Sequence, residues 1–304
     1  MRIASLLASA TESVCELGLG DQLVAISHEC DHPPEALSKP RVSRPLFEAA
    51  GLGSGEIDRA VRDAVSLHGG VYELDVEKLR EVRPDLILAQ GLCEVCAVPA
   101  ATAGGVVALL DGEPRVLSLD AHTIEEILDG IRSVGSAAGV LSRAEAYVAG
   151  LRRRLDQVAG RVKGRPRRRV LAIEWLEPVF VPGHWTPEMV ELAGGELLIG
   201  DAGLPSRQVT WDELEGLDPD VLLVMPCGYR LERGRQDAAA HRERLCRVAR
   251  RAVDAGQAFV LNGSDYFNRS GPRVVTGVEI LGALLHPELF GGYDLAGKAE
   301  VWGQ

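Results

Sequence analysis

Apolar residues in this chain alternate between short runs typical of buried strands and longer stretches with the spacing of a helix face. The strand-like runs are residues 3–7, 23–27, 86–89, 115–119, 170–174, 221–225 and 258–261, with a further short run at 41–43. The helical stretches are residues 11–17, 76–82, 123–138, 142–163, 187–192, 211–217, 241–255 and 272–285. Glycine and proline interrupt residues 44–70, which we expect to be irregular. The alternation predicts an α/β protein with parallel sheets and helices packed outside them.

One unit of this pattern occurs twice. Residues 79–93 and 214–228 each contain a short helix, a Pro-Asp pair, an apolar strand and a loop that carries a cysteine. A unit that recurs about 135 residues further along the chain predicts two similar lobes. We therefore expect the loops of Cys93 and Cys227 to face each other across a cleft.

The longest helical stretch lies between the two copies. Residues 142–163 contain no proline, and at ~1.5 Å per residue they would reach roughly 33 Å, about the diameter of a domain. The strand–helix pattern then starts again near residue 170. These features predict two Rossmann-like lobes, residues 1–140 and 165–304, bridged by one long helix at 141–164.

Composition and charge narrow the class of partner. The chain has 304 residues, of which 46% are hydrophobic and 25% charged, and its formal net charge is −11. Such an acidic balance argues against nucleic acid or an anionic membrane surface as the main partner. No apolar run approaches the ~18 residues of a membrane span, so the protein is not expected to be embedded in a membrane.

The first residues lead to an expectation about location. Strand-like residues follow Met1 directly, and polar Ser9, Thr11 and Glu12 come soon after, without the long apolar core of a secretory signal. We therefore expect a cytoplasmic protein, in which cysteines stay mostly reduced, with a periplasmic or extracellular location as the alternative if an unrecognised export route exists.

The rule for open parallel sheets places the site. Ligands bind outside the carboxyl ends of the strands, which selects the loops at residues 8–11, 28–32, 91–96, 174–185, 226–229 and 262–273. These loops gather most of the candidate binding residues, although aromatic residues are only 5% of the chain. The candidates are Ser9, Thr11, His28, Glu174, Trp175, His184, Trp185, Tyr229, Tyr266, Phe267 and Arg269. Arg269 would suit an anionic group such as a carboxylate or phosphate, or else a surface ion pair.

The same loops hold cysteines at spacings that suit a metal. Cys93 and Cys96 form a Cys-x-x-Cys motif, and Cys30 and Cys227 lie on other loops of the expected cleft. Four thiolates, or thiolates with a histidine, would ligate zinc or an iron–sulfur cluster. The alternative is that they are small buried residues beneath a ligand.

Signatures of catalysis are scarce. The chain has no phosphate-binding glycine motif, no Gly-x-Ser-x-Gly and no His-Glu-x-x-His. A weaker hypothesis is an enzyme that uses Cys96 as a nucleophile.

Several of these segments together resemble a known family. They are residues 5–12 with 17–19, 28–31, 84–87, 91–96, 174–175, 183–189, 225–228, 266–267, 271–273 and 284–290. They resemble the cobalamin-binding protein family, which is related to the substrate-binding components of vitamin B12 and iron-chelate ABC importers. The resemblance spans nearly the whole chain.

The resemblance implies two α/β lobes bridged by a long rigid helix, with a ligand held between them. It implies a binding protein, not an enzyme, with a corrinoid or metal chelate as ligand and an ABC permease as partner. We therefore predict a binding protein for cobalamin or a related corrinoid. The alternative is a cytoplasmic metalloprotein that binds zinc or an iron–sulfur cluster through Cys30, Cys93, Cys96 and Cys227.

Overall fold

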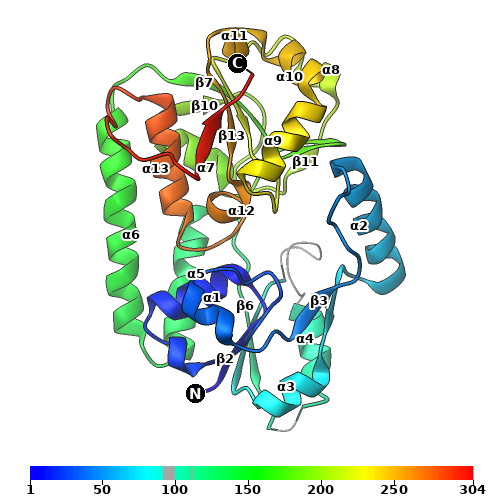
Figure 1. Cartoon of the computed structure of the whole chain (residues 1–304). Helices are drawn as coiled ribbons and strands as arrows, with labels where there is room; N and C mark the ends of the chain where they lie inside the picture. Colours follow the sequence, from blue (N-terminus) through cyan, green and yellow to red (C-terminus); the bar gives the residue numbers. More distant parts are fainter. Residues whose placement is uncertain (92–99, 111, 304) are drawn as a thin grey trace.

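Two parallel sheets, one in each half of the chain, confirm the predicted α/β architecture (Figure 1). The computed structural model describes residues 1–91, 100–110 and 112–303. The N-terminal sheet has the order β2-β1-β5-β6, with strands Leu23–Ile26, Ile3–Ser5, Leu86–Ala89 and Arg115–Ser118. The C-terminal sheet has the order β10-β7-β12-β13-β14, with strands Gly195–Leu197, Arg168–Ile173, Val221–Val224, Ala258–Leu261 and Ala299–Val301. Only its last neighbour pair, β13 with β14, is antiparallel.

Helices surround both sheets. In the first half they are α1 (Ala8–Glu16), α2 (Ser54–His68), α3 (Val76–Val82), α4 (Ala100–Val107) and α5 (Ile124–Ala137). Helix α6 (Leu141–Val162) follows. In the second half they are α7 (Thr186–Leu192), α8 (Trp211–Leu214), α9 (Leu231–Ala240), α10 (Arg242–Val248), α11 (Arg250–Asp254), α12 (Gly263–Tyr266) and α13 (Val274–Leu285). Two small antiparallel sheets pair β3 (Ser43–Pro45) with β4 (Tyr72–Leu74), and β9 (Val179–Val181) with β8 (Trp175–Leu176) and β11 (Arg207–Gln208).

Side chains of each sheet alternate between two cores, as the period of two in a strand requires. In β5, Leu86 and Leu88 belong to one core, whereas Ile87 and Ala89 belong to another. The C-terminal sheet divides its side chains in the same way. Each sheet is therefore buried on both faces, which explains why its strands read as continuous apolar runs.

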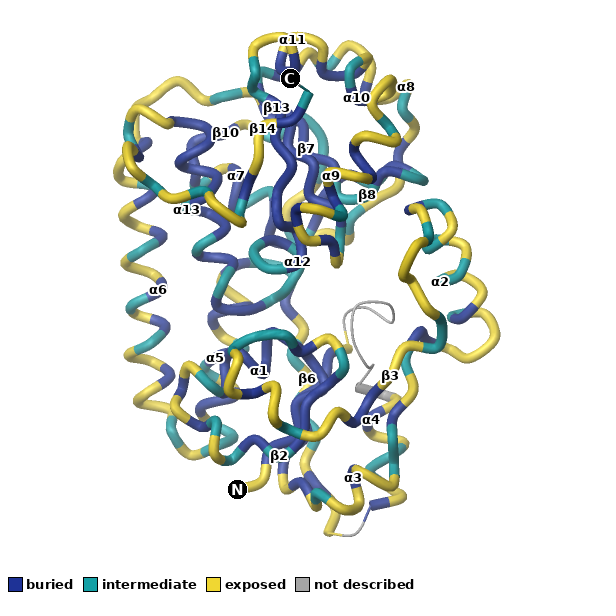
Figure 2. Tube along the Cα trace, viewed as in Figure 1, coloured by how far each residue is buried: buried dark blue, intermediate teal, exposed yellow. Residues whose placement is uncertain are grey.

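Helix α6 joins the lobes through a core that they share. Its buried residues recur at intervals of three and four and form one apolar stripe, which consists of Ala144, Val148, Leu151, Leu155, Val158 and Val162. This stripe lies in a single hydrophobic core that includes residues of α1 and α5 from one lobe and of α7 and α13 from the other. The outer side of α6 is exposed along one edge of the molecule (Figure 2). The predicted bridging helix is thus anchored in both lobes.

The sequence repeat corresponds to equivalent strands. β5 lies between β1 and β6, and β12 lies between β7 and β13. In the first lobe, the carboxylate of Asp85 accepts the backbone N–H of Arg2 at 2.7 Å, and its own N–H bonds back to the Arg2 carbonyl at 2.8 Å. Asp220 makes the same two-way contact with Arg169, at 2.9 and 2.8 Å. The Pro-Asp pair of the repeat therefore fixes the start of the neighbouring strand in both lobes.

Three local predictions were wrong. Residues 44–70 are not irregular throughout, because α2 begins after Gly53, where Glu56 caps the backbone N–H at 2.8 Å, and ends at Gly69 with φ +72°. The glycines that suggested breaks mark its two ends. Residues 8–11 are the first turn of α1 rather than a loop. The helix predicted at 241–255 is broken at Ala249, although its apolar spacing continues across the break.

Within the described part of the chain, no helix is both long and apolar enough to cross a membrane.

The packing of α5 on α6 predicts opposite effects on stability for two glycine-to-alanine substitutions. A Cβ atom added at Gly135 would lie 2.4 Å from the Cβ of Ala144, whereas one at Gly150 would have only the end of Arg153 nearby, at 3.7 Å. Alanine normally favours a helix over glycine by about 1 kcal/mol. We expect Gly150→Ala to be neutral or stabilising and Gly135→Ala to lower the free energy of unfolding by about 1–3 kcal/mol. Urea denaturation measures both, and stabilisation by Gly135→Ala would contradict the close α5–α6 contact.

Candidate functional site at the junction of the lobes

A buried ion pair joins the two lobes near the carboxyl ends of their strands. Glu12, on α1, has a side chain that is only 3% exposed. Both of its carboxylate oxygens accept hydrogen bonds from the guanidinium of Arg273, at 2.5 and 2.9 Å. Arg273 directly precedes α13 in the other lobe. This two-point geometry is the strongest form of a charged hydrogen bond between side chains.

A second pair continues the contact. Asp31 follows β2, and its carboxylate accepts hydrogen bonds from Arg269 at 2.6 and 3.1 Å and from Arg230 at 2.8 Å. Both arginines belong to the C-terminal lobe. We call the set Glu12, Asp31, Arg230, Arg269 and Arg273 the junction network. Its members lie on α1, which follows β1, and in the segments after β2, β12 and β13, at the edges that the strand-end rule predicts for a ligand site.

Burial and charge oppose each other within the junction network. Burial raises the pKa of Glu12 although Arg273 and Arg269 favour its charged form. Burial also opposes ionisation of Asp31, but the hydrogen bonds and charge of Arg269 outweigh it and lower the pKa of that carboxyl. Burial thus opposes ionisation of Glu12, and the arginine partners favour ionisation of Asp31. Each carboxylate therefore contributes to stability only while its arginine partner is present.

Two aromatic residues pack together at the end of the C-terminal sheet. The rings of Trp175 and Tyr229 are 5.2 Å apart between centroids and tilted by 56°. The hydroxyl of Tyr229 is buried, and burial raises its pKa against an opposing effect of the neighbouring Arg233, so it stays protonated. Glu174, beside Trp175, accepts a hydrogen bond from the Ser206 hydroxyl, which lies 3.0 Å from each carboxylate oxygen. These groups combine an apolar face with polar atoms, as ligand sites usually do.

Residues that follow Tyr229 along the chain contact the N-terminal lobe. The next residue, Arg230, bonds Asp31, and Arg233 donates to the carbonyl of Leu52 just before α2. Ser54, the first residue of α2, donates to Asp237 of α9 at 3.0 Å. Helix α9 is therefore held against the other lobe in two places, at Arg233 and at Asp237.

His28 is fixed on the N-terminal lobe. Its Nδ1 lies 2.8 Å from the hydroxyl of Ser43, its ring centroid is 4.7 Å from that of Tyr72, and its Nε2 lies 3.3 Å from the Glu29 carboxylate. The His28 side chain is 17% exposed. It is therefore an oriented imidazole on the lobe opposite Trp175 and Tyr229.

His184 lies elsewhere, at the start of α7. Its backbone has φ +50°, a left-handed conformation, and is held by hydrogen bonds to the segment at Gly203 and Leu204. Its ring is 5.4 Å from that of His122, across the lobe boundary. Burial, with a smaller effect of His122, lowers the pKa of His184, so the imidazole is neutral at pH 7.

Other predicted site residues have little or no free surface. Ser9 and Thr11 are buried in α1, and Thr11 Oγ1 lies 3.1 Å from the Sγ of Cys30. Trp185 is 6% exposed and donates its indole N–H to the carbonyl of Phe267 at 2.7 Å. Phe267 itself is fully buried. Of the aromatic candidates in the second half, Trp175 and Tyr266 keep partly exposed rings, and Arg273 lies over that of Tyr266 at 5.8 Å.

The cysteines do not form a visible metal site. Cys30 is fully buried between Thr11 and Ser27, and burial raises the pKa of its thiol. Cys227 is half-buried, and Cys93 and Cys96 lie outside the described residues. Among the residues that are described, no group of three or more His, Cys, Asp or Glu side chains could hold a metal ion. Zinc and an iron–sulfur cluster therefore have no support here, and the facing of the two cysteine loops stays a prediction.

Sequence reasoning found Arg269 but missed its partners. Glu12, Asp31 and Arg273 lie in the segments quoted for the family resemblance, but nothing local indicates that Glu12 pairs with a residue 261 positions away. The one available signal was the occurrence of acidic residues at strand ends in one half and arginines at strand ends in the other.

Comparison with known proteins gives the family. The family described as periplasmic binding protein matches residues 3–261. The vitamin B12-binding protein of Vibrio cholerae is 26% identical over 281 residues, which cover 91% of this chain and 86% of that protein. An uncharacterized ABC transporter substrate-binding lipoprotein of Bacillus subtilis is 24% identical over 297 residues, which cover 95% of this chain and 81% of that protein.

Solved structures agree on the fold. The periplasmic vitamin B12 binding protein of Vibrio cholerae matches with a TM-score of 0.66 and 24% identity, covering 93% of this chain and 96% of that one. A periplasmic heme binding protein from Pseudomonas aeruginosa matches with a TM-score of 0.69 and 22% identity, covering 94% of this chain and 92% of that one.

The chain belongs to the periplasmic binding protein family. This confirms the resemblance predicted from the sequence and the prediction that the protein is a binding protein rather than an enzyme. The prediction of a cytoplasmic protein is wrong, because the family is periplasmic and the Bacillus relative is a lipoprotein. Family membership outweighs the pattern of residues after Met1 as evidence for the location of the protein. The expectation that the cysteines stay reduced rested on a cytoplasmic location and therefore loses its basis.

The first prediction from the site concerns the buried pair. Glu12→Gln keeps the size of the side chain but leaves Arg273 only its longer ion pairs, to Asp265 at 3.6 Å and Asp31 at 4.0 Å. We therefore expect the free energy of unfolding to fall by about 2 kcal/mol. Glu73→Gln is the control, because Glu73 pairs with Arg44 at 2.6 Å on the surface, with side chains 50% and 75% exposed. There we expect a change below about 1 kcal/mol. Equal losses in urea denaturation would contradict the importance of burial.

The second prediction concerns pH. The pKa of Asp31 is lower in the folded protein than the roughly 3.9 of an unfolded chain, so its contribution to stability is present above about pH 4 and lost as the pH falls through the folded value. Asp31→Asn should therefore destabilise the protein clearly at pH 7 and progressively less on acidification below pH 4. Denaturation at several pH values measures this difference against Asp63→Asn, on exposed helix α2. A loss that stays constant with pH would count against the proposed pairing.

Proposed function

We propose that this protein binds cobalamin or a related corrinoid between its two lobes, for an ABC importer. The observation that carries the proposal is the similarity to a vitamin B12-binding protein over 91% of the chain. The lobes in this proposal are residues 1–140 and 165–304, with 141–164 as the bridge. The proposed partner is the permease of the importer.

The chemistry of the described residues supports a large, partly apolar ligand. A corrinoid needs aromatic and aliphatic surface together with a few hydrogen-bonding groups for its peripheral amides. Trp175 and Tyr266 would supply the surface, with the buried ring of Tyr229 packed against Trp175, and the Glu174 carboxylate would supply a polar contact. His28 would approach from the other lobe, where it could contact either the amides or the metal of the corrinoid.

The charged candidates have a different role in this proposal. Arg269 is already engaged by Asp31, and releasing it to bind an anion would leave a half-buried carboxylate with one partner fewer. We therefore assign Arg269 to holding the lobes together and not to direct ligand contact. His184 interacts with His122 away from the aromatic pair, and we assign it to the same junction.

The binding prediction is tested with cyanocobalamin and hydroxocobalamin by calorimetry. We expect saturable binding with one site, and Trp175→Ala should weaken it by about tenfold or more, because a buried aromatic contact of this size contributes over about 1.4 kcal/mol. Trp211→Ala is the control, since Trp211 is a half-buried indole of the same lobe on α8. An equal loss of affinity in both variants, or no binding above millimolar by the unaltered protein, would contradict the proposal.

Haemin is the second ligand to titrate, because a heme binding protein shares the fold. Saturable haemin binding without corrinoid binding would overturn the corrinoid assignment and leave the family assignment intact.

A further inference from the structure

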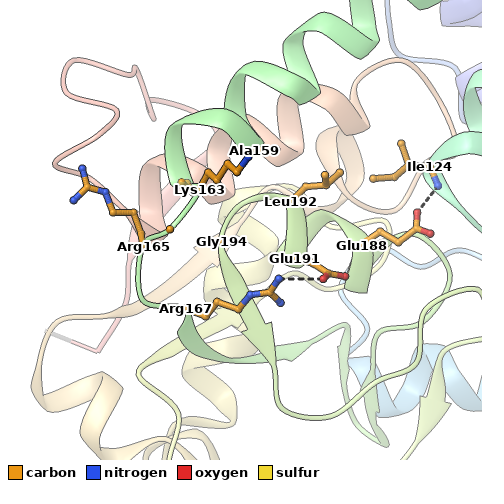
Figure 3. Close-up of a pocket in the computed structure, with 11 residues that line it drawn as sticks. Ile124, Ala159, Lys163, Arg165, Arg167, Glu188, Glu191, Leu192 and Gly194 are labelled. Atoms are coloured by element: carbon orange, nitrogen blue, oxygen red, sulfur yellow. Dashed lines mark hydrogen bonds and ion pairs between the residues drawn. The ribbon is translucent and has the colours of Figure 1, made fainter.

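A hollow in the surface lies apart from the aromatic pair of Trp175 and Tyr229 (Figure 3). Its volume is about 540 Å³, and it lies between the last turn of α6, helix α7 and the first residue of α5. Arg167 and Gly194, which line it, precede β7 and β10. The cavity therefore reaches the amino ends of these strands, opposite the edge where the junction network and the aromatic pair lie.

The cavity has an apolar surface drawn from three parts of the fold. Ile124 comes from α5 of the N-terminal lobe, Ala159 and Val162 from α6, and Leu192 from α7. Val162 and Ile124 also belong to the core that the two lobes share. A molecule in the cavity would thus contact both lobes and the bridging helix at once.

The charges around the cavity leave an excess of positive charge. Glu191 is paired with Arg167 at 3.1 Å, and Glu188 accepts the backbone N–H of Ile124 at 2.7 Å, where the N-terminus of α5 favours a negative charge (Figure 3). Both carboxylates in the lining are therefore already compensated. Lys163 and Arg165 form no ion pair with any described residue, although the chain carries a net charge of −11.

We propose that this cavity is a binding site for an amphiphilic organic anion, a carboxylate or phosphate carried on an apolar body. The apolar residues would bury the body, and Lys163 and Arg165 would pair with the anionic group. A volume of about 540 Å³ is within the usual range of roughly 300–1,000 Å³ for small-molecule sites. The proposal does not depend on corrinoid binding, because it uses none of the residues assigned to that site.

Binding here would stabilise the packing of both lobes against the bridging helix. A ligand that binds only the folded protein raises its free energy of unfolding by an amount that grows with the logarithm of the ligand concentration divided by its dissociation constant. Because the cavity is formed jointly by α5, α6 and α7, its occupant would stabilise their packing. The consequence is a thermal transition that rises with anion concentration.

The test titrates the full chain with decanoate below its micellar concentration, by calorimetry, and follows the thermal transition. We expect saturable binding with one site and a rise in the transition temperature. Decylammonium, with the same apolar chain and the opposite charge, should bind at least about tenfold more weakly.

Two variants locate the site. Ala159→Phe fills the cavity and should abolish decanoate binding, and Lys163→Glu should weaken it by about tenfold or more. The matched control is Arg153→Glu, which makes the same charge change on an exposed residue of α6 outside the lining. Circular dichroism establishes whether each variant folds. If Ala159→Phe does not fold, Lys163→Glu still decides the question, because Lys163 is exposed.

Three results would overturn the proposal. They are no saturable decanoate binding, equal weakening by Lys163→Glu and Arg153→Glu, and equal binding of decanoate and decylammonium. Vesicles of phosphatidylglycerol form a further arm, since they distinguish a free anion from a membrane surface. Binding to vesicles without binding of monomeric decanoate would assign the basic residues to a lipid surface and would also contradict the cavity site.

Discussion

The buried pair of Glu12 and Arg273 is the interaction on which the arrangement of the two lobes depends. A carboxylate that is 3% exposed cannot stay charged without a partner, and its partner comes from the opposite lobe. Separating the lobes at this point would therefore break both hydrogen bonds of the pair. Asp31 with Arg269 and Arg230 extends the same constraint to the loops after β2, β12 and β13. The orientation of the aromatic residues beside these loops follows from it.

Helix α6 imposes a second constraint of a different physical kind. Its apolar stripe lies within one hydrophobic core that continues from lobe to lobe, so bending it would expose apolar surface to water. The ion pairs are directional and act at the strand ends, whereas the shared core is non-directional and acts along one edge. Together they favour a binding protein whose lobes shift little on binding, in agreement with a rigid bridge.

Local patterns predicted the fold well. The apolar runs gave all strands of the N-terminal sheet and β7, β12 and β13 of the C-terminal sheet, but they missed its edge strands β10 and β14. The spacing of three and four gave α6, and the repeat gave equivalent strands because Asp85 and Asp220 perform the same task in each lobe. The site was harder, because its main contacts join residues more than 200 positions apart. Residue type also could not distinguish Trp175, which is partly exposed, from Trp185 and Phe267, which are buried against each other. Helix α2 was missed because its bounding glycines resembled breaks in a loop.

The most direct test of this account is a crystal structure of the hydroxocobalamin complex, with cobalt located by its anomalous scattering. We expect cobalt between the lobes, with Trp175 and Tyr229 on one side and His28 on the other, and the Glu12–Arg273 pair intact. Cobalt bound outside the junction, or a complex in which the lobes have rotated far enough to break that pair, would contradict it.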